Sequence, residues 1–137
     1  MRERGSGQIC AISSVVGFFG FKQRTAYSAS KHAMKGFFES LRLEEWDSGI
    51  EVNVVYPGSI RTNISKYAVN EKGEAHGQMD PRQQGGMPAD LCARKIIRGM
   101  ERNKGEILVG RRELLLVYVR RCWPWLYFRA AKNIDPT

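Results

Sequence analysis

The stretch Gln8-Ile-Cys-Ala-Ile-Ser-Ser14 decides the fold of this chain of 137 residues. It is short, apolar and bounded by Gly7 and Gly17, which is typical of a strand that is buried on both faces. A second run, residues 50–56, is rich in β-branched residues and ends at Pro57. Strands buried on both faces belong to parallel sheets, so both runs predict such a sheet.

The segments between and after these runs have helical periodicity. Apolar side chains recur on one face of residues 25–46, and Gly49 is the expected C-terminal cap of that helix. A second amphipathic helix is predicted to begin at Pro88, and residues 105–109 have the composition of a short third strand. Strands that alternate with helices predict an α/β domain.

Charge is distributed unevenly along the chain. The net charge is +8, and residues 94–137 alone contain 11 Lys and Arg against 4 Asp and Glu. Basic regions bind nucleic acid or anionic membranes, but no nucleic-acid-binding signature accompanies this charge, so we expect no nucleic-acid partner. Cys10, Cys92 and Cys122 are scattered without the spacing of metal ligands, so we expect no metal site and a reducing compartment.

The most specific chemical feature is Tyr27-Ser-Ala-Ser-Lys31. On a helix, residues four apart lie on one face, so the Tyr27 phenol and the Lys31 ammonium project side by side. Free tyrosine keeps its proton up to about pH 10, but a fixed cation beside it stabilises the phenolate. A tyrosine placed in this way can act as a general acid or base, although the spacing alone is often a chance pair on a surface helix.

Two further features follow the predicted strands. Ser14 ends the first strand, and Pro57-Gly58-Ser-Ile60-Arg-Thr62 ends the second. Because α/β sheets bind ligands at the carboxyl ends of parallel strands, these features are predicted to meet at one site. Gly58 permits a close approach of the backbone to a ligand, and Thr62 has a hydroxyl that can bond a carboxamide. We expect the neighbouring Ser13 to have a structural role.

Together, the three stretches 7–14, 27–31 and 57–62 resemble the short-chain dehydrogenase/reductase family, and in particular its 11β-hydroxysteroid dehydrogenase-like branch. The resemblance implies the C-terminal portion of a doubly wound parallel-sheet, NAD(P)-binding Rossmann-type fold, with about three strands and flanking helices. It also implies an oxidoreductase that interconverts an alcohol and a carbonyl on a small molecule, with a lipid- or steroid-like substrate favoured by the branch.

The resemblance further implies the roles of individual residues. Ser14 would bond the substrate oxygen, Tyr27 would exchange its proton, and Lys31 would bind the nicotinamide ribose. The cofactor would be NAD(P)(H), with NADP(H) favoured, and hydride would pass between it and the substrate carbon. The implied cofactor-binding residues are Tyr27, Lys31, Pro57, Gly58, Ile60 and Thr62.

The chain departs from the family pattern in two respects. The family has a Gly-rich phosphate-binding turn and a catalytic Asn before the Ser strand, whereas Gly17-Phe-Phe-Gly20 follows that strand. Residues 1–5 resemble the end of the helix that leads into it. We therefore expect the C-terminal half of a larger domain, which by itself would bind the cofactor poorly and lack activity. The alternatives are an inactive truncated remnant and a membrane-surface or interaction module.

The chain is expected to divide into a catalytic part, residues 1–110, and a basic aromatic tail, residues 111–137. Within the first part, residues 59–87 correspond to the family's substrate lid, where Tyr67, His76 and Met79 are candidates to line a pocket. The helix that contains Tyr27 is a candidate homodimer interface in a full-length form.

The tail interleaves apolar and basic side chains. This pattern predicts that residues 111–132 form a helix that lies in a membrane interface. Packing on its own domain or on a partner is the alternative. Neither a secretory signal nor an apolar run long enough to span a membrane is found, so we expect the cytoplasmic side of a membrane, that of the endoplasmic reticulum in the resembled branch. The residues concerned are Leu114, Leu115, Leu116, Val117, Tyr118, Trp123, Trp125, Leu126, Tyr127 and Phe128, with Arg111, Arg112, Arg120, Arg121, Arg129 and Lys132.

Overall fold

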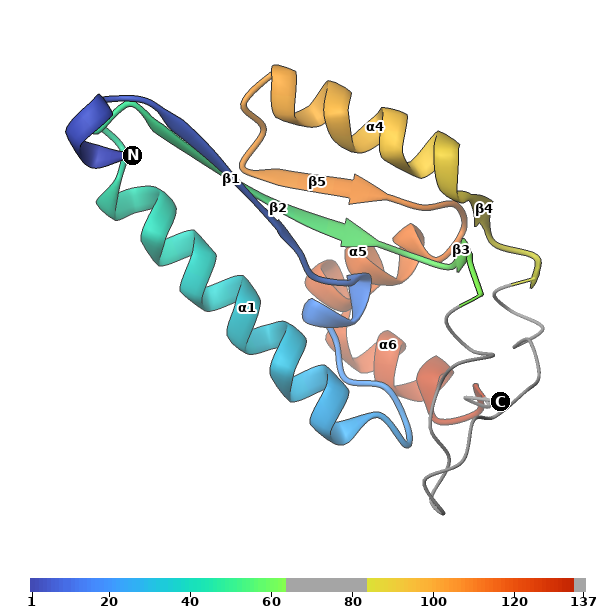
Figure 1. Ribbon diagram of the computed structural model, residues 1–137. Helices are drawn as coiled ribbons and strands as arrows, with labels where there is room; N and C mark the ends of the chain where they lie inside the picture. Colours follow the sequence, from blue (N-terminus) through green and yellow to red (C-terminus); the bar gives the residue numbers. More distant parts are fainter. Residues whose placement is uncertain (64–83, 135–137) are drawn as a thin grey trace, which may run out of the picture.

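The computed structural model describes residues 1–63 and 84–134. Its main sheet has three parallel strands in the order β1-β2-β5, with β2 in the centre (Figure 1). The predicted parallel sheet with flanking helices is confirmed. A second parallel pair, β3 with β4, lies beyond the end of β2. The strands are β1 (Gly7–Ile12), β2 (Ile50–Pro57), β3 (Ile60–Arg61), β4 (Met87–Pro88) and β5 (Glu106–Val109).

Helices cover both faces of the sheet. The long helix α1 and the C-terminal helices α5 and α6 pack on one face, and α4 packs on the other (Figure 1). A break just before Pro124 separates α5 from α6. The helical elements are η1 (Arg2–Arg4), η2 (Val15–Gly17), α1 (Thr25–Glu44), α4 (Ala89–Glu101), α5 (Leu114–Cys122) and α6 (Pro124–Ala131).

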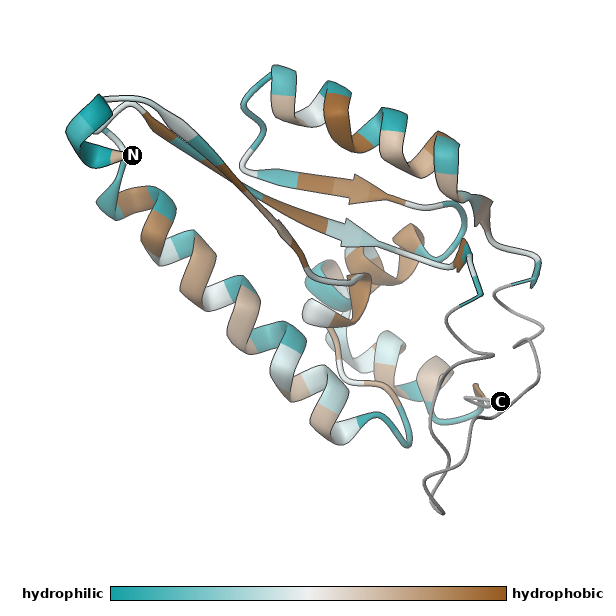
Figure 2. Ribbon diagram, viewed as in Figure 1, coloured by the Kyte–Doolittle hydropathy of each residue, from teal (hydrophilic) through white to brown (hydrophobic). Residues whose placement is uncertain are grey.

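Strand β2 forms the centre of the core. Its Val52, Val54, Val55 and Tyr56 are between 0% and 2% exposed, as the run rich in β-branched residues predicts. Because successive side chains of a strand point to opposite faces, Val54 and Tyr56 pack towards η2 and the C-terminal helices, while Val55 packs towards α4. Figure 2 shows the same division, with hydrophobic strands between helices of mixed hydropathy.

The C-terminal tail packs partly on its own domain. Val117 of α5 and Tyr127 of α6 are 5% and 1% exposed and join the cluster around β2. The Tyr127 ring lies 5.4 Å from that of Phe19, and its hydroxyl donates to the carbonyl of Gly20. Burial raises the pKa of the Tyr127 phenol. These two side chains therefore belong to the core, whereas the sequence alone placed them with the membrane-facing set.

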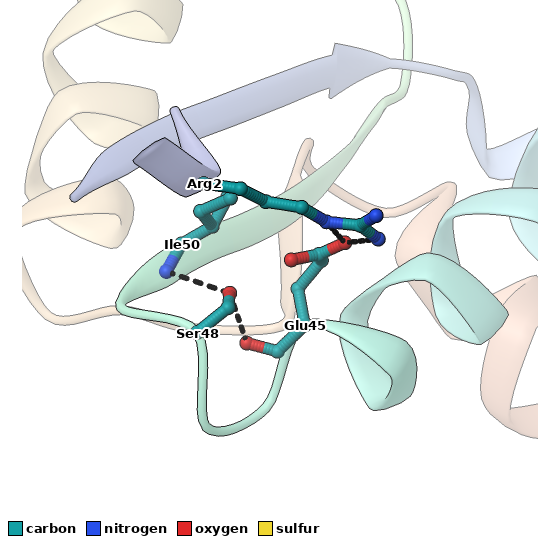
Figure 3. A network of polar contacts seen from close by, with 4 residues as sticks. All are labelled: Arg2, Glu45, Ser48 and Ile50. Carbon is teal, nitrogen blue, oxygen red and sulfur yellow. Dashed lines mark hydrogen bonds and ion pairs between the residues drawn. The ribbon is translucent and has the colours of Figure 1, made fainter. Parts of the chain in front are cut away.

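The end of α1 differs from the prediction. The helix ends at Glu44, and Gly49 is not its cap but lies in the following turn, with φ of 75°. The Ser48 hydroxyl donates to the Glu45 carbonyl at 2.8 Å and accepts from the Ile50 amide at 3.2 Å, which closes this turn (Figure 3). Gly49 is needed because a Cβ there would lie 2.2 Å from the Gly5 carbonyl oxygen.

An ion pair joins this turn to the first residues of the chain. The Nε of Arg2 donates to Oε1 of Glu45 at 2.8 Å, and the guanidinium Nη2 contacts the same oxygen (Figure 3). Glu45 is 3% exposed, so its carboxylate depends on this partner. The Arg2 hydrogen bond is the main cause that lowers the pKa of Glu45. Both residues lie at the edge of the sheet opposite to the predicted site.

A Glu45→Gln variant tests this ion pair. Because the pKa of Glu45 is lowered by folding, its contribution to stability is present above the ordinary carboxyl range and is lost as the pH falls through the folded value. We expect Glu45→Gln to lower the free energy of unfolding at pH 7 and to differ less from the wild type at pH 3, in urea titrations. Glu44→Gln, at an exposed neighbour, is the control. An equal difference at both pH values would contradict the assignment.

Candidate active site

The carboxyl ends of the strands bring two of the three motifs together. In the parallel register, Ile12 of β1 lies beside Val55, and Pro57 lies beside Val109 of β5. Ser14, which follows β1, therefore reaches the end of β2, and its hydroxyl lies 3.5 Å from the Pro57 carbonyl oxygen, to which it donates. The sequence prediction that these features share one edge of the sheet agrees with this geometry.

The two adjacent serines have different environments. The Ser14 hydroxyl caps η2 by accepting from the Val16 amide at 3.3 Å, and it lies at the predicted site. The Ser13 hydroxyl points to α1 instead and donates to the Lys31 carbonyl at 3.2 Å. Both serines are buried. Ser13 therefore joins the end of β1 to α1, which is the structural role expected of it.

Tyr27 and Lys31 lie on one face of α1, in its first two turns. The Lys31 Nζ lies 5.6 Å from the centroid of the Tyr27 ring. The same nitrogen donates to the carbonyl of Ile12 at 3.4 Å, which places the ammonium at the end of β1. Tyr27 is 44% exposed, and its hydroxyl has no hydrogen-bond partner within residues 1–63 and 84–134. The phenol is thus accessible to a ligand beside a positioned cation.

The loop after β2 is bonded by three separate segments. The Gly58 amide donates to the Val109 carbonyl at 2.8 Å, and the Ser59 carbonyl accepts from the Met87 amide at 2.9 Å. The Ser59 amide donates to the Glu113 carboxylate at 3.0 Å. Sequence reasoning missed Glu113, because no motif marks it. Ile60 lies in β3 and Thr62 is half-buried just beyond it, which extends the loop along the same edge.

These residues fit one end of a nicotinamide dinucleotide. The Ser14 hydroxyl contacts the turn at Pro57, the Lys31 ammonium contacts the end of β1, and the Tyr27 ring lies beside that ammonium; the chemistry of these groups suits an uncharged ring and a ribose. The diphosphate has no comparable cradle in the described part of the chain, since Gly17–Gly20 does not lead directly into α1. Nor do three His, Cys, Asp or Glu side chains of these residues lie close enough to hold a metal ion.

The predicted lid is described only at its ends. Residues 59–63 and 84–87 are these ends, and they are joined where β3 pairs with β4, Ile60 beside Met87. Tyr67, His76 and Met79, the candidates to line a pocket, lie outside the described residues.

Comparisons with known proteins identify the family. The family model described as "short chain dehydrogenase" matches residues 1–73, which include the Ser14, Tyr27–Lys31 and Pro57–Thr62 motifs. The chain belongs to the short chain dehydrogenase family. The predicted family resemblance is therefore confirmed.

Relatives within the family share much of the sequence. A "Dehydrogenase/reductase SDR family protein 7-like" of Drosophila melanogaster is 43% identical over 93% of this chain and 40% of its own length. "Dehydrogenase/reductase SDR family member 7B" of Danio rerio is 40% identical over 94% of the chain and 42% of its own length. The chain thus spans about two fifths of these relatives and falls in their branch of the family.

Solved structures of short chain dehydrogenases have the same fold. One from Streptomyces avermitilis has a TM-score of 0.71 at 27% identity, over 98% of this chain and 54% of the other. One from Sphingobium yanoikuyae, in complex with NADPH, has a TM-score of 0.65 at 25% identity, over 99% of this chain and 49% of the other. Both support a Rossmann-type arrangement of the sheet and helices.

The structural role of Ser13 can be measured. We expect Ser13→Ala to lower the free energy of unfolding by about 1 kcal/mol, because the part-buried hydrogen bond from Ser13 to the Lys31 carbonyl is lost. Ser30→Ala, at an exposed position of the same helix, should change it by less than about 0.5 kcal/mol. Urea titration of both variants provides the comparison, and an equal effect would argue against a structural bond at Ser13.

Proposed function

We propose that this chain contains the proton-transfer part of the active site of an NAD(P)-dependent oxidoreductase that interconverts an alcohol and a carbonyl. The observation behind the proposal is the position of Tyr27 and Lys31 on one face of α1, at the strand end that Ser14 also occupies. The proposal concerns a full-length form, since the chain covers about two fifths of its curated relatives.

Each of the three residues has a distinct task in this proposal. The Ser14 hydroxyl donates a hydrogen bond to the substrate oxygen, and the accessible Tyr27 phenol exchanges a proton with it. The Lys31 ammonium favours the phenolate by charge attraction and bonds the ribose hydroxyls. The dinucleotide supplies or accepts the hydride when it is bound.

The loop after β2 is proposed to receive the nicotinamide. Backbone groups of Pro57, Gly58 and Ile60 would pack beside the ring, and the Thr62 hydroxyl would bond its carboxamide. The Sphingobium yanoikuyae relative in complex with NADPH supports a nicotinamide dinucleotide, and we favour NADP(H). We further propose that residues 59–87 form a substrate lid and that the substrate is lipid- or steroid-like.

The alternative to an active enzyme is an inactive remnant with the same side chains. In that case a full-length form would neither bind a dinucleotide nor oxidise an alcohol. The 137-residue chain by itself is proposed to bind the dinucleotide poorly, because the described residues fit only the nicotinamide end of the cofactor. Titration of the full-length form and of the 137-residue chain with the dinucleotide distinguishes an active enzyme from an inactive remnant.

A Tyr27→Phe variant of a full-length form tests the proton transfer. We expect turnover to fall by about 10²–10⁴-fold while the dissociation constant of the dinucleotide stays within error, because only the proton donor is removed. Tyr118→Phe, at a tyrosine of α5 that is 55% exposed, is the matched control and should leave turnover unchanged. Substantial residual turnover in Tyr27→Phe would refute the assignment.

The exposed side of α5 and α6 favours a second function, contact with an anionic membrane surface. Leu115, Trp125 and Phe128 are 63%, 66% and 59% exposed, so these two helices together expose several large apolar side chains. Exposed Arg121 and Arg129 lie on the same two helices, so the patch matches an anionic lipid surface in charge as well as in hydrophobicity. No helix within residues 1–63 and 84–134 is long and apolar enough to cross a membrane.

Further contacts are proposed on the same grounds. We propose the cytoplasmic side for the membrane contact on the scattered spacing of Cys10, Cys92 and Cys122, which fits a reducing compartment. A homodimer through α1 is proposed for a full-length form. Phe37 of α1 is 63% exposed, which leaves it available for such an interface.

Flotation of the chain with vesicles tests the membrane contact. We expect the chain to bind vesicles that contain phosphatidylserine. In the double variant Arg121→Gln/Arg129→Gln, the free energy of binding should weaken by about 1 kcal/mol for each charge removed. The control, Arg94→Gln with Arg98→Gln on α4, removes equal charge from the opposite face of the sheet. Trp125→Ser should also weaken binding, whereas Trp46→Ser, at an exposed tryptophan outside the patch, should not. Equal losses in variants and controls would exclude the patch.

A further inference from the structure

The loop Pro57–Thr62 depends on one side chain from the C-terminal tail. Two of its bonds, from Gly58 to Val109 and from Met87 to Ser59, join backbone to backbone and require no particular side chain. The third joins the Ser59 amide to the carboxylate of Glu113 at 3.0 Å. A hydrogen bond to a carboxylate is stronger than one to a neutral acceptor, so this bond is sensitive to sequence in a way the other two are not.

The backbone around Glu113 makes room for its carboxylate. A Cβ on Gly58 would lie 2.0 Å from Oε1 of Glu113 and 2.5 Å from its Cγ. A Cβ on Gly110 would lie 2.9 Å from the same oxygen. Two glycines from different segments thus border one half-buried acidic side chain. The absence of a side chain at Gly58 therefore has a local reason, independent of any bound ligand.

Glu113 also belongs to the start of α5. Its carbonyl accepts from the Leu116 amide at 3.1 Å, so the residue that bonds the loop also opens the helix. The loop in turn adjoins the site, because the Pro57 carbonyl accepts from the Ser14 hydroxyl. A continuous set of bonds runs from the first turn of α5 through Ser59 to the end of β1.

We infer that Glu113 is a positioning residue of the active site, which holds the loop Pro57–Thr62 in place through the Ser59 amide. It touches neither substrate nor cofactor in this role. The inference rests on the proposed function only in that the loop receives the nicotinamide. The hydrogen bond and its effect on the loop stand independently of that function, and they can be measured without a cofactor.

Amide hydrogen exchange in the 137-residue chain measures the bond directly. We expect Glu113→Ala to speed the exchange of the Ser59 amide by about tenfold or more, because a charge-assisted hydrogen bond is lost. Glu113→Gln keeps an acceptor of the same size and should restore most of the protection. The Gly58 amide, bonded to Val109, should stay unchanged in both variants, which distinguishes a local loss from general unfolding. Unchanged exchange at Ser59 in Glu113→Ala would overturn the inference.

A double-mutant cycle tests the close contact with Gly58. Gly58→Ala alone should destabilise the fold, because its new methyl group would overlap the carboxylate. In the Glu113→Ala background the same substitution should cost less, since the obstructing group is absent. Additive effects in urea titrations would show that the two residues are not coupled and would contradict the inference.

Dinucleotide binding by a full-length form separates this inference from the proposed function. We expect Glu113→Ala to raise the dissociation constant by about tenfold and Glu113→Gln to raise it less, in the order of their Ser59 exchange rates. Faster exchange of the Ser59 amide with an unchanged dissociation constant of the dinucleotide would refute the positioning role and leave the proposed function intact. A wild type that binds no dinucleotide would refute the proposed function, while the exchange experiment would still decide whether Glu113 holds the loop.

Discussion

The parallel register that sets Ile12 beside Val55, and Pro57 beside Val109, determines where the functional side chains lie. A buried central strand resists a shift in register, because a shift by one residue would turn every core side chain to the other face. With β2 fixed in this way, the carboxyl ends of all three parallel strands lie at the same edge of the sheet. The candidate site residues lie within a few positions of that edge or bond to it.

The helix α1 is attached to the same edge by two contacts of one residue. The Lys31 carbonyl accepts from Ser13, and the Lys31 ammonium donates to the Ile12 carbonyl. Backbone and side chain of Lys31 are thus both fixed relative to the end of β1. Tyr27 lies one turn earlier on the same helix, so this attachment also fixes its position relative to the strand end although the residue is 44% exposed.

Local patterns in the sequence predicted the three strands of the main sheet, the long helix and the meeting of Ser14 with Pro57, because each depends on periodicity or on parallel topology. The short pair β3 and β4 was not predicted, and β1, expected to be buried on both faces, is only partly buried, with Ile12 49% exposed. The predicted end of α1 was wrong by two residues. The turn that follows the helix is closed by Ser48 and by the ion pair of Glu45 with the distant residue Arg2. Contacts between residues far apart in sequence leave no local signal. For the same reason the bond from Glu113 to Ser59 was not predicted.

The tail shows the same limit in another form. Its aromatic and basic residues predicted an amphipathic surface, and Trp125 and Phe128 are indeed exposed. Composition did not reveal that Tyr127, within the same short helix, enters the core beside Phe19. Neighbouring aromatic residues in a helix point in different directions, and only the packed structure shows which of them has a partner.

The burial of Tyr127 has a mechanical consequence for any surface that α5 and α6 bind. A helix with a side chain locked into the core cannot act as a loose tether, because lifting it away would open the hydrophobic cluster around β2. A lipid surface bound by these helices would therefore hold the whole domain in one orientation. The site would then keep a fixed tilt relative to the bilayer, whereas a domain joined to the membrane by a flexible linker would sample many orientations.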